Sequence, residues 1–259
     1  MFTKEQLKEQ LKNMGIKSDD TVLIHTSFKA VGEVEGGIDG FIDTFKEYLS
    51  DGLFIIPTHT WAVVTPENPI YDVKTTVPCI GAVPTVAAFR SDGIRSLHPS
   101  HSVWATGKNA KKFIAGEENA QTPAPVGGSW YRLADIGAKI LLIGVNHDRN
   151  TFIHAVDEAA GLDDRFAPTI WNVTVTDYEG KQITHKFQHH GATGYQNFGN
   201  FEKMFIAKGV QTTGKLGNAE VKICDAKKCM KVLLALYSKV DEHLCLEPRD
   251  IPEYLYEEI

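Results

Sequence analysis

Short, nearly continuous apolar runs alternate with amphipathic helical segments along this chain, and this alternation limits its fold more than any other feature. Residues 21–25, 53–57 and 139–145 are strand-length runs without regular polar alternation, so we expect these strands to be covered on both faces. The helical spacing in residues 38–49 links the first two runs into a β-loop-α-β unit. The pattern predicts an α/β protein whose sheet lies between helices.

The remaining segments extend this prediction to a mixed sheet. Residues 169–176 and 183–187 alternate around a turn at 177–180, which predicts a late β-hairpin. Residues 61–78 lack periodicity and are expected to form a surface loop of the long kind that is often functional. The other expected elements are helices at 4–14, 81–89, 151–160, 198–208 and 226–239, and strands at 102–106 and 219–224. Without repeats or linkers, residues 1–259 are expected to form a single domain with a mixed central sheet flanked by helices.

Composition excludes several classes of protein. The chain has 33 acidic and 27 basic side chains and a formal charge of −6, which disfavours a nucleic-acid partner and suits a cationic small molecule. No apolar run approaches the ~20 residues needed to span a bilayer. The first fourteen residues are amphipathic and unlike a signal peptide, so we expect a cytoplasmic protein without a membrane partner. The cysteines lack zinc-finger spacing and should be free thiols: Cys79, Cys224, Cys229 and Cys245.

Three segments carry candidate chemistry, and the first is the glycine-punctuated loop at residues 25–37. It follows a predicted strand and precedes a helix, where α/β proteins commonly bind ligands. Its amides, hydroxyls and Lys29 suit a phosphate group. It has neither a Walker A ending nor GxGxxG, and a plain turn with a helix cap is the alternative.

The second segment, residues 95–107, contains His98 and His101. Two histidines three apart are potential metal ligands, but Pro99 breaks the helix that would bring them to one face. Hydroxyl and backbone donors that line a pocket are the preferred interpretation of this segment.

The third segment contains Thr151, His154 and Glu158, which share one face of a helix that begins at Thr151. A carboxylate one turn from an imidazole can hold its tautomer and stabilise the imidazolium, as a general base requires. The alternative is an ordinary surface ion pair.

These segments also carry a family resemblance. Five stretches resemble, in the same order and with similar spacing, the aminoglycoside 3-N-acetyltransferase family: LIHTSFKAVGEVEGG (23–37), PTHTW (57–61), RSLHPSHSVWATG (95–107), GAKILLIGVNHDRNTFIHAVDE (137–158) and GKLGNAEVKICDAK (214–227).

The resemblance implies transfer of acetyl from acetyl-coenzyme A to the 3-amino group of an aminoglycoside, a reaction of antibiotic resistance, without a metal. His154 would be the general base, oriented by Glu158 with Thr151 beside it, and His25 is a second catalytic candidate. The neutral amine would attack the thioester directly in a ternary complex. Amides of the first loop or His25 would stabilise the oxyanion. The protein is expected to be a monomer or homodimer.

The resemblance also implies two sets of binding residues. The coenzyme A set is Ser27, Lys29, Ala30, Val31 and Gly32, with Ser102 and Val103 on the opposite wall. The acceptor set is His59, Trp61, Asp157, His189 and His190.

One departure concerns the acceptor. Where resistance members carry an acidic cluster after the hairpin, residues 187–194 of this chain are FQHHGATG. Other acids could still make the mouth of the site negative: Glu33, Glu35, Asp157 and the pair Asp163 and Asp164. The native acceptor is therefore an aminoglycoside or another amine.

Two other functions remain open from the residues. A metal-dependent hydrolase would assemble its ligands from the histidine-rich segments: His59, His98, His101, His185, His189 and His190. A non-catalytic protein would bind coenzyme A or an amine without releasing thiol. Metal content and thiol release distinguish the three.

Overall fold

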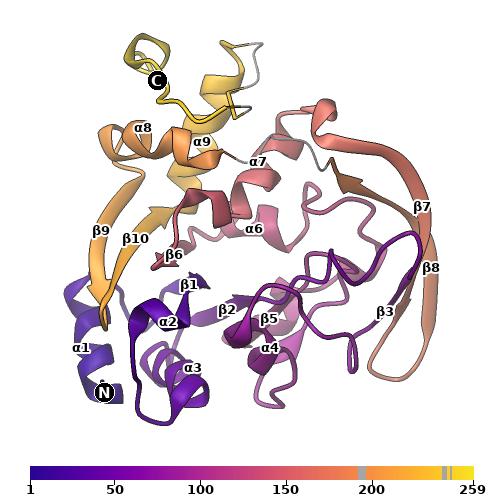
Figure 1. The fold of residues 1–259 in the computed structure, drawn as a ribbon, viewed down its shortest axis with the longest axis horizontal. Coiled ribbons are helices and arrows are strands. Elements are labelled where there is room, and N and C mark those ends of the chain that lie inside the picture. Colours follow the sequence, from indigo (N-terminus) through magenta and orange to yellow (C-terminus); the bar gives the residue numbers. More distant parts are fainter. Residues whose placement is uncertain (192–196, 241–243, 246) are drawn as a thin grey trace.

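A seven-stranded mixed sheet forms the centre of the computed structural model, which describes residues 1–191, 197–240, 244–245 and 247–259 (Figure 1). Its strand order is β4-β5-β2-β1-β6-β10-β9. In chain order these strands are β1 (Thr21–Thr26), β2 (Leu53–Pro57), β4 (Ile94–Arg95), β5 (Val103–Gly107), β6 (Lys139–Ile143), β9 (Gln211–Leu216) and β10 (Ala219–Asp225).

The three central strands are parallel, and they locate a crevice. β1 pairs with β2 on one side and with β6 on the other, both in parallel, while β5 and β10 flank this core antiparallel. The chain runs from β1 to β2 in one direction and returns to β6 in the other, so the strand order reverses at β1. Ligands of open α/β sheets bind at the carboxyl ends of strands at such a point.

Helices cover both faces of the central sheet, as the apolar runs predicted. Along β1, Val22 and Ile24 belong to the core on one face and Leu23 to the core on the other, which is the two-residue period of a strand. The first face is covered by α1 (Lys4–Asn13), α3 (Gly37–Tyr48) and α4 (Ala82–Ala88). The second is covered by α6 (Ser129–Asp135), α7 (Phe152–Ala159), α8 (Glu202–Ala207) and α9 (Ala226–Tyr237). Two short helices, α2 (Phe28–Val31) and α5 (Ala110–Phe113), follow β1 and β5.

The predicted hairpin exists but lies outside the central sheet. β7 (Phe166–Thr176) and β8 (Gln182–His190) pair antiparallel, and β3 (Ile70–Asp72) joins them in a separate three-stranded sheet. This small sheet has its own apolar core, formed by Val64, Tyr71, Val73, Val173, Val175 and Phe187. It stands at the right of Figure 1 beside the carboxyl end of the main sheet.

Three strands were not predicted from the sequence: β3, β4 and β9. β4 is only two residues long. β3 lies within the expected loop at 61–78, and its three residues form a strand because they pair with the distant β7. β9 is an edge strand that pairs only with β10 among the described residues, and most of its side chains face solvent, so it lacks an apolar signal. In the described part of the chain, no helix is long and apolar enough to cross a membrane. The four cysteines are free, as expected.

Candidate active site

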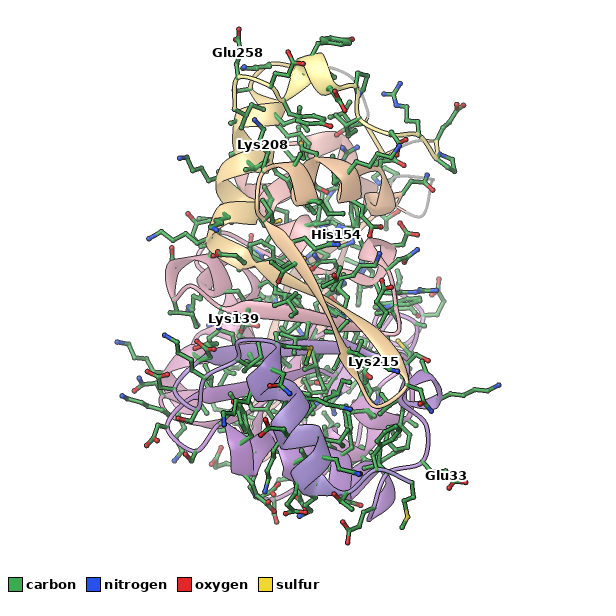
Figure 2. All side chains as sticks on the ribbon, turned by 90° about the vertical axis from the view of Figure 1, so that its left-hand side faces the viewer. Glu33, Lys139, His154, Lys208, Lys215 and Glu258 are labelled. Carbon is green, nitrogen blue, oxygen red and sulfur yellow. The ribbon has the colours of Figure 1, made fainter. Side chains whose placement is uncertain are left out.

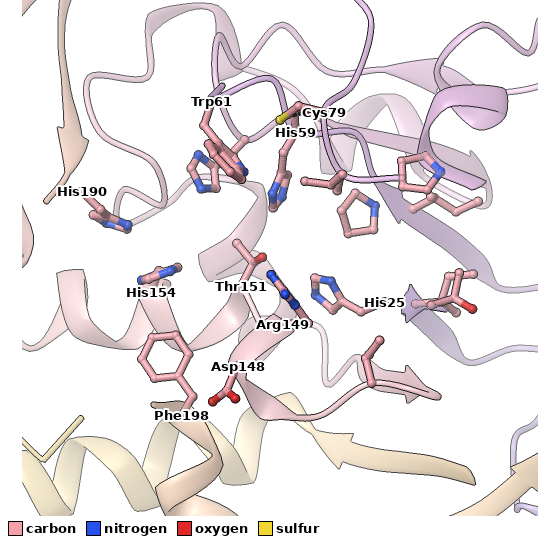
Figure 3. Close-up of a pocket in the computed structure, with 18 of the residues that line it drawn as sticks. His25, His59, Trp61, Cys79, Asp148, Arg149, Thr151, His154, His190 and Phe198 are labelled. Carbon is pink, nitrogen blue, oxygen red and sulfur yellow. Dashed lines mark hydrogen bonds between the residues drawn. The ribbon is translucent and has the colours of Figure 1, made fainter. Parts of the chain in front are cut away.

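A cavity of about 770 Å³ opens at the carboxyl ends of β1 and β2, where the strand order reverses (Figure 3). One wall comes from the end of β1 and from the segment after β6, and the other from the loop after β2 and the end of β8. His154 of α7 lines the cavity between these two walls. The first wall thus belongs to the central sheet, and the second combines the end of a central strand with the end of β8 in the small sheet.

His154 lies on α7 and faces the cavity between His190 and Phe198 (Figure 3). The ring centroids of His154 and His190 are 4.3 Å apart, and that of Phe198 lies 5.0 Å from His154. Burial and the neighbouring His190 and Arg165 hold the pKa of His154 well below its usual 6.5. The imidazole is therefore neutral near pH 7 and able to accept a proton.

Asp157 lies behind His154 and does not line the cavity, so the prediction that it contacts the acceptor is corrected. Its Oδ2 is 3.9 Å from Nδ1 of His154, and both atoms are buried without a hydrogen-bond partner among the described residues. Tyr237 of α9 donates to Oδ1 at 2.8 Å, and Arg165 Nε lies 3.6 Å from Oδ2. Burial raises the pKa of Asp157 to about 6.

Glu158 does not orient His154, contrary to the sequence prediction. Its carboxylate accepts hydrogen bonds from Thr122 Oγ1 at 2.6 Å and from the amide of Ala124 at 2.8 Å. His190 Nε2 lies 2.8 Å from its Oε1. Burial raises the pKa of Glu158 to about 7. Glu158 therefore positions His190, because its side chain leaves α7 toward the loop at 120–124 and away from His154.

The indole of Trp130 supports a group of histidines on the far side of the cavity. His25 stacks on Trp130 with centroids 6.0 Å apart, and His59 meets it edge-on at 5.3 Å. Burial lowers the pKa of His25 to about 3 and that of His59 well below 6.5. Nε2 of each ring is buried and has no partner within the described part of the protein. Both rings are neutral and offer unused hydrogen-bonding atoms.

The loop predicted to bind coenzyme A reaches the cavity through Ser27, which follows β1 directly. Lys29 is exposed. Ala30 packs so closely on Gly144 that a Cβ at that glycine would lie 2.5 Å from the Cβ of Ala30. Val31 is fully buried in the core. Gly32 has a φ of +91° and ends the short helix α2.

Ser102 and Val103 do not form the opposite cavity wall, which corrects another prediction. Both are buried, and Ser102 Oγ donates to the carbonyl of Thr58 at 2.7 Å. Arg95 Nε donates to the same hydroxyl at 3.3 Å. The hydroxyl of Ser102 is used internally and holds the loop after β2 in place.

Other predicted residues lie at the cavity. Thr151, at the start of α7, and His59, Trp61, His189 and His190 all line it. His189 Nε2 is 3.3 Å from the carbonyl of Val64, which fixes the end of β8 against the loop after β2.

His101 also lines the cavity, whereas His98 and His185 are held by backbone groups. His98 Nδ1 accepts the amides of Ser100 and His101, and its Nε2 lies 3.0 Å from the carbonyl of Thr122. His185 Nε2 bonds to the carbonyl of Ala120. Within the described ranges, no group of three or more His, Cys, Asp or Glu side chains is arranged to hold a metal ion. The histidines therefore give the hydrolase interpretation no geometric support.

The predicted catalytic and binding sets omitted several cavity residues, among them Cys79, Asp148, Arg149 and Phe198. Asp148 and Arg149 lie in the stretch directly after β6, and their place after a predicted parallel strand was the available signal. Cys79 and Phe198 had no such signal, because pairings distant in sequence bring them to the cavity.

The fold and the site together define an α/β protein with a buried, neutral imidazole in a cavity at the point where its sheet reverses strand order. The model of the aminoglycoside 3-N-acetyltransferase family matches residues 23–238, so the chain belongs to that family and is an acetyltransferase.

Relatives and solved structures agree with this family. The SPbeta prophage-derived aminoglycoside N(3')-acetyltransferase-like protein YokD of Bacillus subtilis is 27% identical over 248 residues, 85% of this chain and 87% of that protein. The fold resembles that of aminoglycoside acetyltransferase AAC(3)-IVa in complex with a gentamicin (TM-score 0.78, 22% identity, 90% of this chain and 87% of that chain). It also resembles AAC-IIIb in its binary complex with CoASH (TM-score 0.73, 19% identity, 89% and 94%).

Proposed function

We propose that this protein transfers acetyl from acetyl-coenzyme A to a primary amine of an aminoglycoside or a related acceptor, with His154 as the general base. The observation that carries the proposal is the neutral imidazole of His154 at the cavity, with the buried carboxyl group of Asp157 behind it. Family membership and the ligands named for AAC-IIIb and AAC(3)-IVa support the donor and the acceptor class. We further propose that residues 1–259 form one acetyltransferase domain.

In the proposed reaction, the neutral Nε2 of His154 takes a proton from the acceptor nitrogen as that nitrogen attacks the thioester carbonyl carbon. The new C–N bond forms, the C–S bond breaks, and the imidazolium of His154 returns the proton to the sulfur, which leaves as coenzyme A thiol. Asp157 is close enough to Nδ1 to stabilise the imidazolium, and hydrogen bonds of this type shorten when substrate binds. Direct transfer within a ternary complex needs no covalent acyl-enzyme.

The donor is proposed to lie along the wall made by β1 and the loop after it. Ser27 offers a hydroxyl at the cavity, and Lys29 offers an exposed ammonium group for a phosphate. His25 is the candidate oxyanion donor, because its buried Nε2 has no other partner within the described residues. Amides of the same loop are the second source.

Release of free thiol from acetyl-coenzyme A tests the proposal, with an amine panel and mass spectrometry of the product. We expect thiol release only when an amine is present, with one acetyl group added to the amine. Binding of coenzyme A without thiol release for every amine would instead support a non-catalytic protein. A burst of thiol without amine would contradict direct transfer and indicate an acyl-enzyme.

A further inference from the structure

We propose that the native acceptor carries a single amino group on a neutral, hydroxylated body, as in a simple amino sugar, and that the cavity disfavours polycations. This inference rests on the proposed acetyl transfer and narrows its acceptor. It comes from the charge and the unused hydrogen-bonding atoms of the cavity walls.

The described cavity walls carry almost no negative charge. Six imidazoles line them, and Asp148 is the one carboxylate among the described lining residues. Arg149 follows it directly, so the two formal charges cancel. Asp148 is also engaged, because its Oδ1 accepts the amide of Gly199 at 2.9 Å and its Oδ2 accepts from Asn146. The segment from Gly191 to Gly199 contains no acidic residue in its sequence.

Of the acids that were expected to make the mouth of the site negative, Glu33, Glu35, Asp157 and Asp164 do not line the cavity. Asp157 is buried behind His154 and contacts Arg165 and Tyr237. Glu158 is occupied by Thr122, Ala124 and His190, as described above. Figure 2 shows Glu33 at the lower margin of the molecule, far from His154 near the centre. No described acid therefore offers an unpaired carboxylate to the cavity.

Physical chemistry then separates two classes of acceptor. Each additional ammonium group that enters this cavity loses hydration without gaining a counter-charge, which is costly in a region of low dielectric constant. A reacting amine avoids this cost because it is consumed as the neutral base. Several fixed cations on one acceptor cannot avoid it.

A neutral hydroxylated body fits the same walls. The buried Nε2 of His59 has no partner in the described protein, and a hydroxyl can donate to or accept from a neutral imidazole. Trp61 lines the cavity and is 46% exposed, which leaves an aromatic face for the apolar side of a sugar ring. These atoms are suited to hydroxyl groups and ring faces.

The first test compares methyl glucosaminide, which has one amine, with gentamicin, which has several. We expect kcat/KM for acetyl transfer to favour the monoamine by about tenfold or more, the scale of 1.4 kcal/mol of lost ion pairing, with little salt dependence. A preference for gentamicin that weakens steeply with salt would overturn the inference.

The second test adds a carboxylate to the wall. His189→Glu should tighten gentamicin binding by about fivefold, the scale of one partly exposed ion pair, and added salt should remove the gain. His189→Gln is the matched neutral control. Trp61→Glu against Trp61→Gln repeats the comparison at an exposed position, where folding is not at risk. If neither carboxylate tightens binding relative to its control, the inference is wrong.

The affinities of the two acceptors, measured by calorimetry, test this inference independently of the proposed function. If no amine releases thiol, the proposed transfer fails, yet the relative affinities of the two acceptors still decide whether the cavity disfavours polycations. If gentamicin binds wild type more tightly than the monoamine, the acceptor inference fails even when thiol release is normal.

Discussion

The groups behind His154 come from several helical segments. Asp157 stands one turn along α7, Tyr237 reaches that carboxylate from α9, and Arg165 contacts it from the segment after α7. The carboxylate of Asp157 thus lies directly behind the neutral imidazole of His154. Water does not reach the gap between them, because Oδ2 of Asp157 and Nδ1 of His154 are both buried.

The first prediction separates the two carboxylates of α7. Asp157→Asn should lower kcat by about 10- to 100-fold, because the imidazolium of His154 loses its stabilising charge. Glu158→Gln should cost less, because it acts through His190 and leaves Asp157 in place. Steady-state thiol release and circular dichroism measure the effect and the fold. Equal losses in the two variants, or a larger loss in Glu158→Gln, would contradict the assignment.

The pH dependence of the same reaction gives a second prediction. Burial raises the pKa of Asp157 to about 6, so its stabilising charge disappears as pH falls through that value. We expect kcat to decline below about pH 6 in wild type, and we expect Asp157→Asn to lack this decline. A wild-type kcat that stays level from about pH 8 to about pH 5 would exclude Asp157 from the reaction.

At this scale, the sequence brought His154 to the site but named the wrong carboxylate beside it. Asp157 and Glu158 both lie about one helix turn after His154. Helix geometry alone therefore could not show which of the two carboxylates lies beside the imidazole. Hydrogen bonds from Thr122 and Ala124, which lie more than thirty positions away in sequence, hold the carboxylate of Glu158 away from His154. Such contacts distant in sequence leave no local pattern.

At the scale of elements, Arg95 ties the short strand β4 to the loop after β2, which carries His59 and Trp61. It is buried, and it donates to the carbonyls of Thr76 at 2.6 Å and Thr58 at 3.1 Å. Its guanidinium also lies 5.2 Å from the ring centroid of Tyr71 in the small sheet. One side chain therefore joins both sheets.

A third prediction follows for this link. Arg95→Met should lower the free energy of unfolding by roughly 3 kcal/mol, since the charge-assisted hydrogen bonds to the carbonyls of Thr76 and Thr58 are lost. It should also raise KM for the acceptor, because the loop at 58–79 loses its anchor. Urea unfolding and steady-state kinetics measure both effects. Lys46→Met removes an exposed ion pair with Asp92 and should cost below about 1 kcal/mol; a similar loss in the two variants would contradict the role of Arg95.

The central βα units were predictable because each element carries its own periodicity and is buried on both faces. The expected helices and the central strands formed close to their predicted bounds. Placement of the hairpin was not predictable, because alternation in β7 and β8 indicates a half-buried sheet without indicating which one. β3 depends wholly on β7, and β9 on β10, so neither carries an independent signal.

For the whole molecule, the buried titratable groups predict an acid-sensitive fold. Burial lowers the pKa of eight histidines in the folded chain. Near pH 6.5, the unfolded chain therefore binds protons at these histidines that the folded chain does not bind. Three carboxyl groups have the opposite effect on stability, because their raised pKa values let the folded chain bind protons at a higher pH than the unfolded chain: Glu117, Asp157 and Glu158. The histidines outnumber them, so stability is lost as pH falls.

Urea unfolding at about pH 7, 6 and 5 checks this fourth prediction. The free energy of unfolding should fall with each step, by about 1.4 kcal/mol per pH unit for each net proton taken up on unfolding. Stability that is unchanged or higher at pH 5 would mean that the histidines are not buried in their neutral form.

The central claim is that His154 is the base for acetyl transfer, and His154→Ala tests it most directly. The measurement is thiol release from acetyl-coenzyme A with a saturating amine, beside the dissociation constant for coenzyme A. We expect kcat to fall by about 10²- to 10⁴-fold while coenzyme A binding stays within about twofold of wild type, since His154 lies apart from the wall proposed for the donor. A variant that keeps near wild-type turnover would contradict the account.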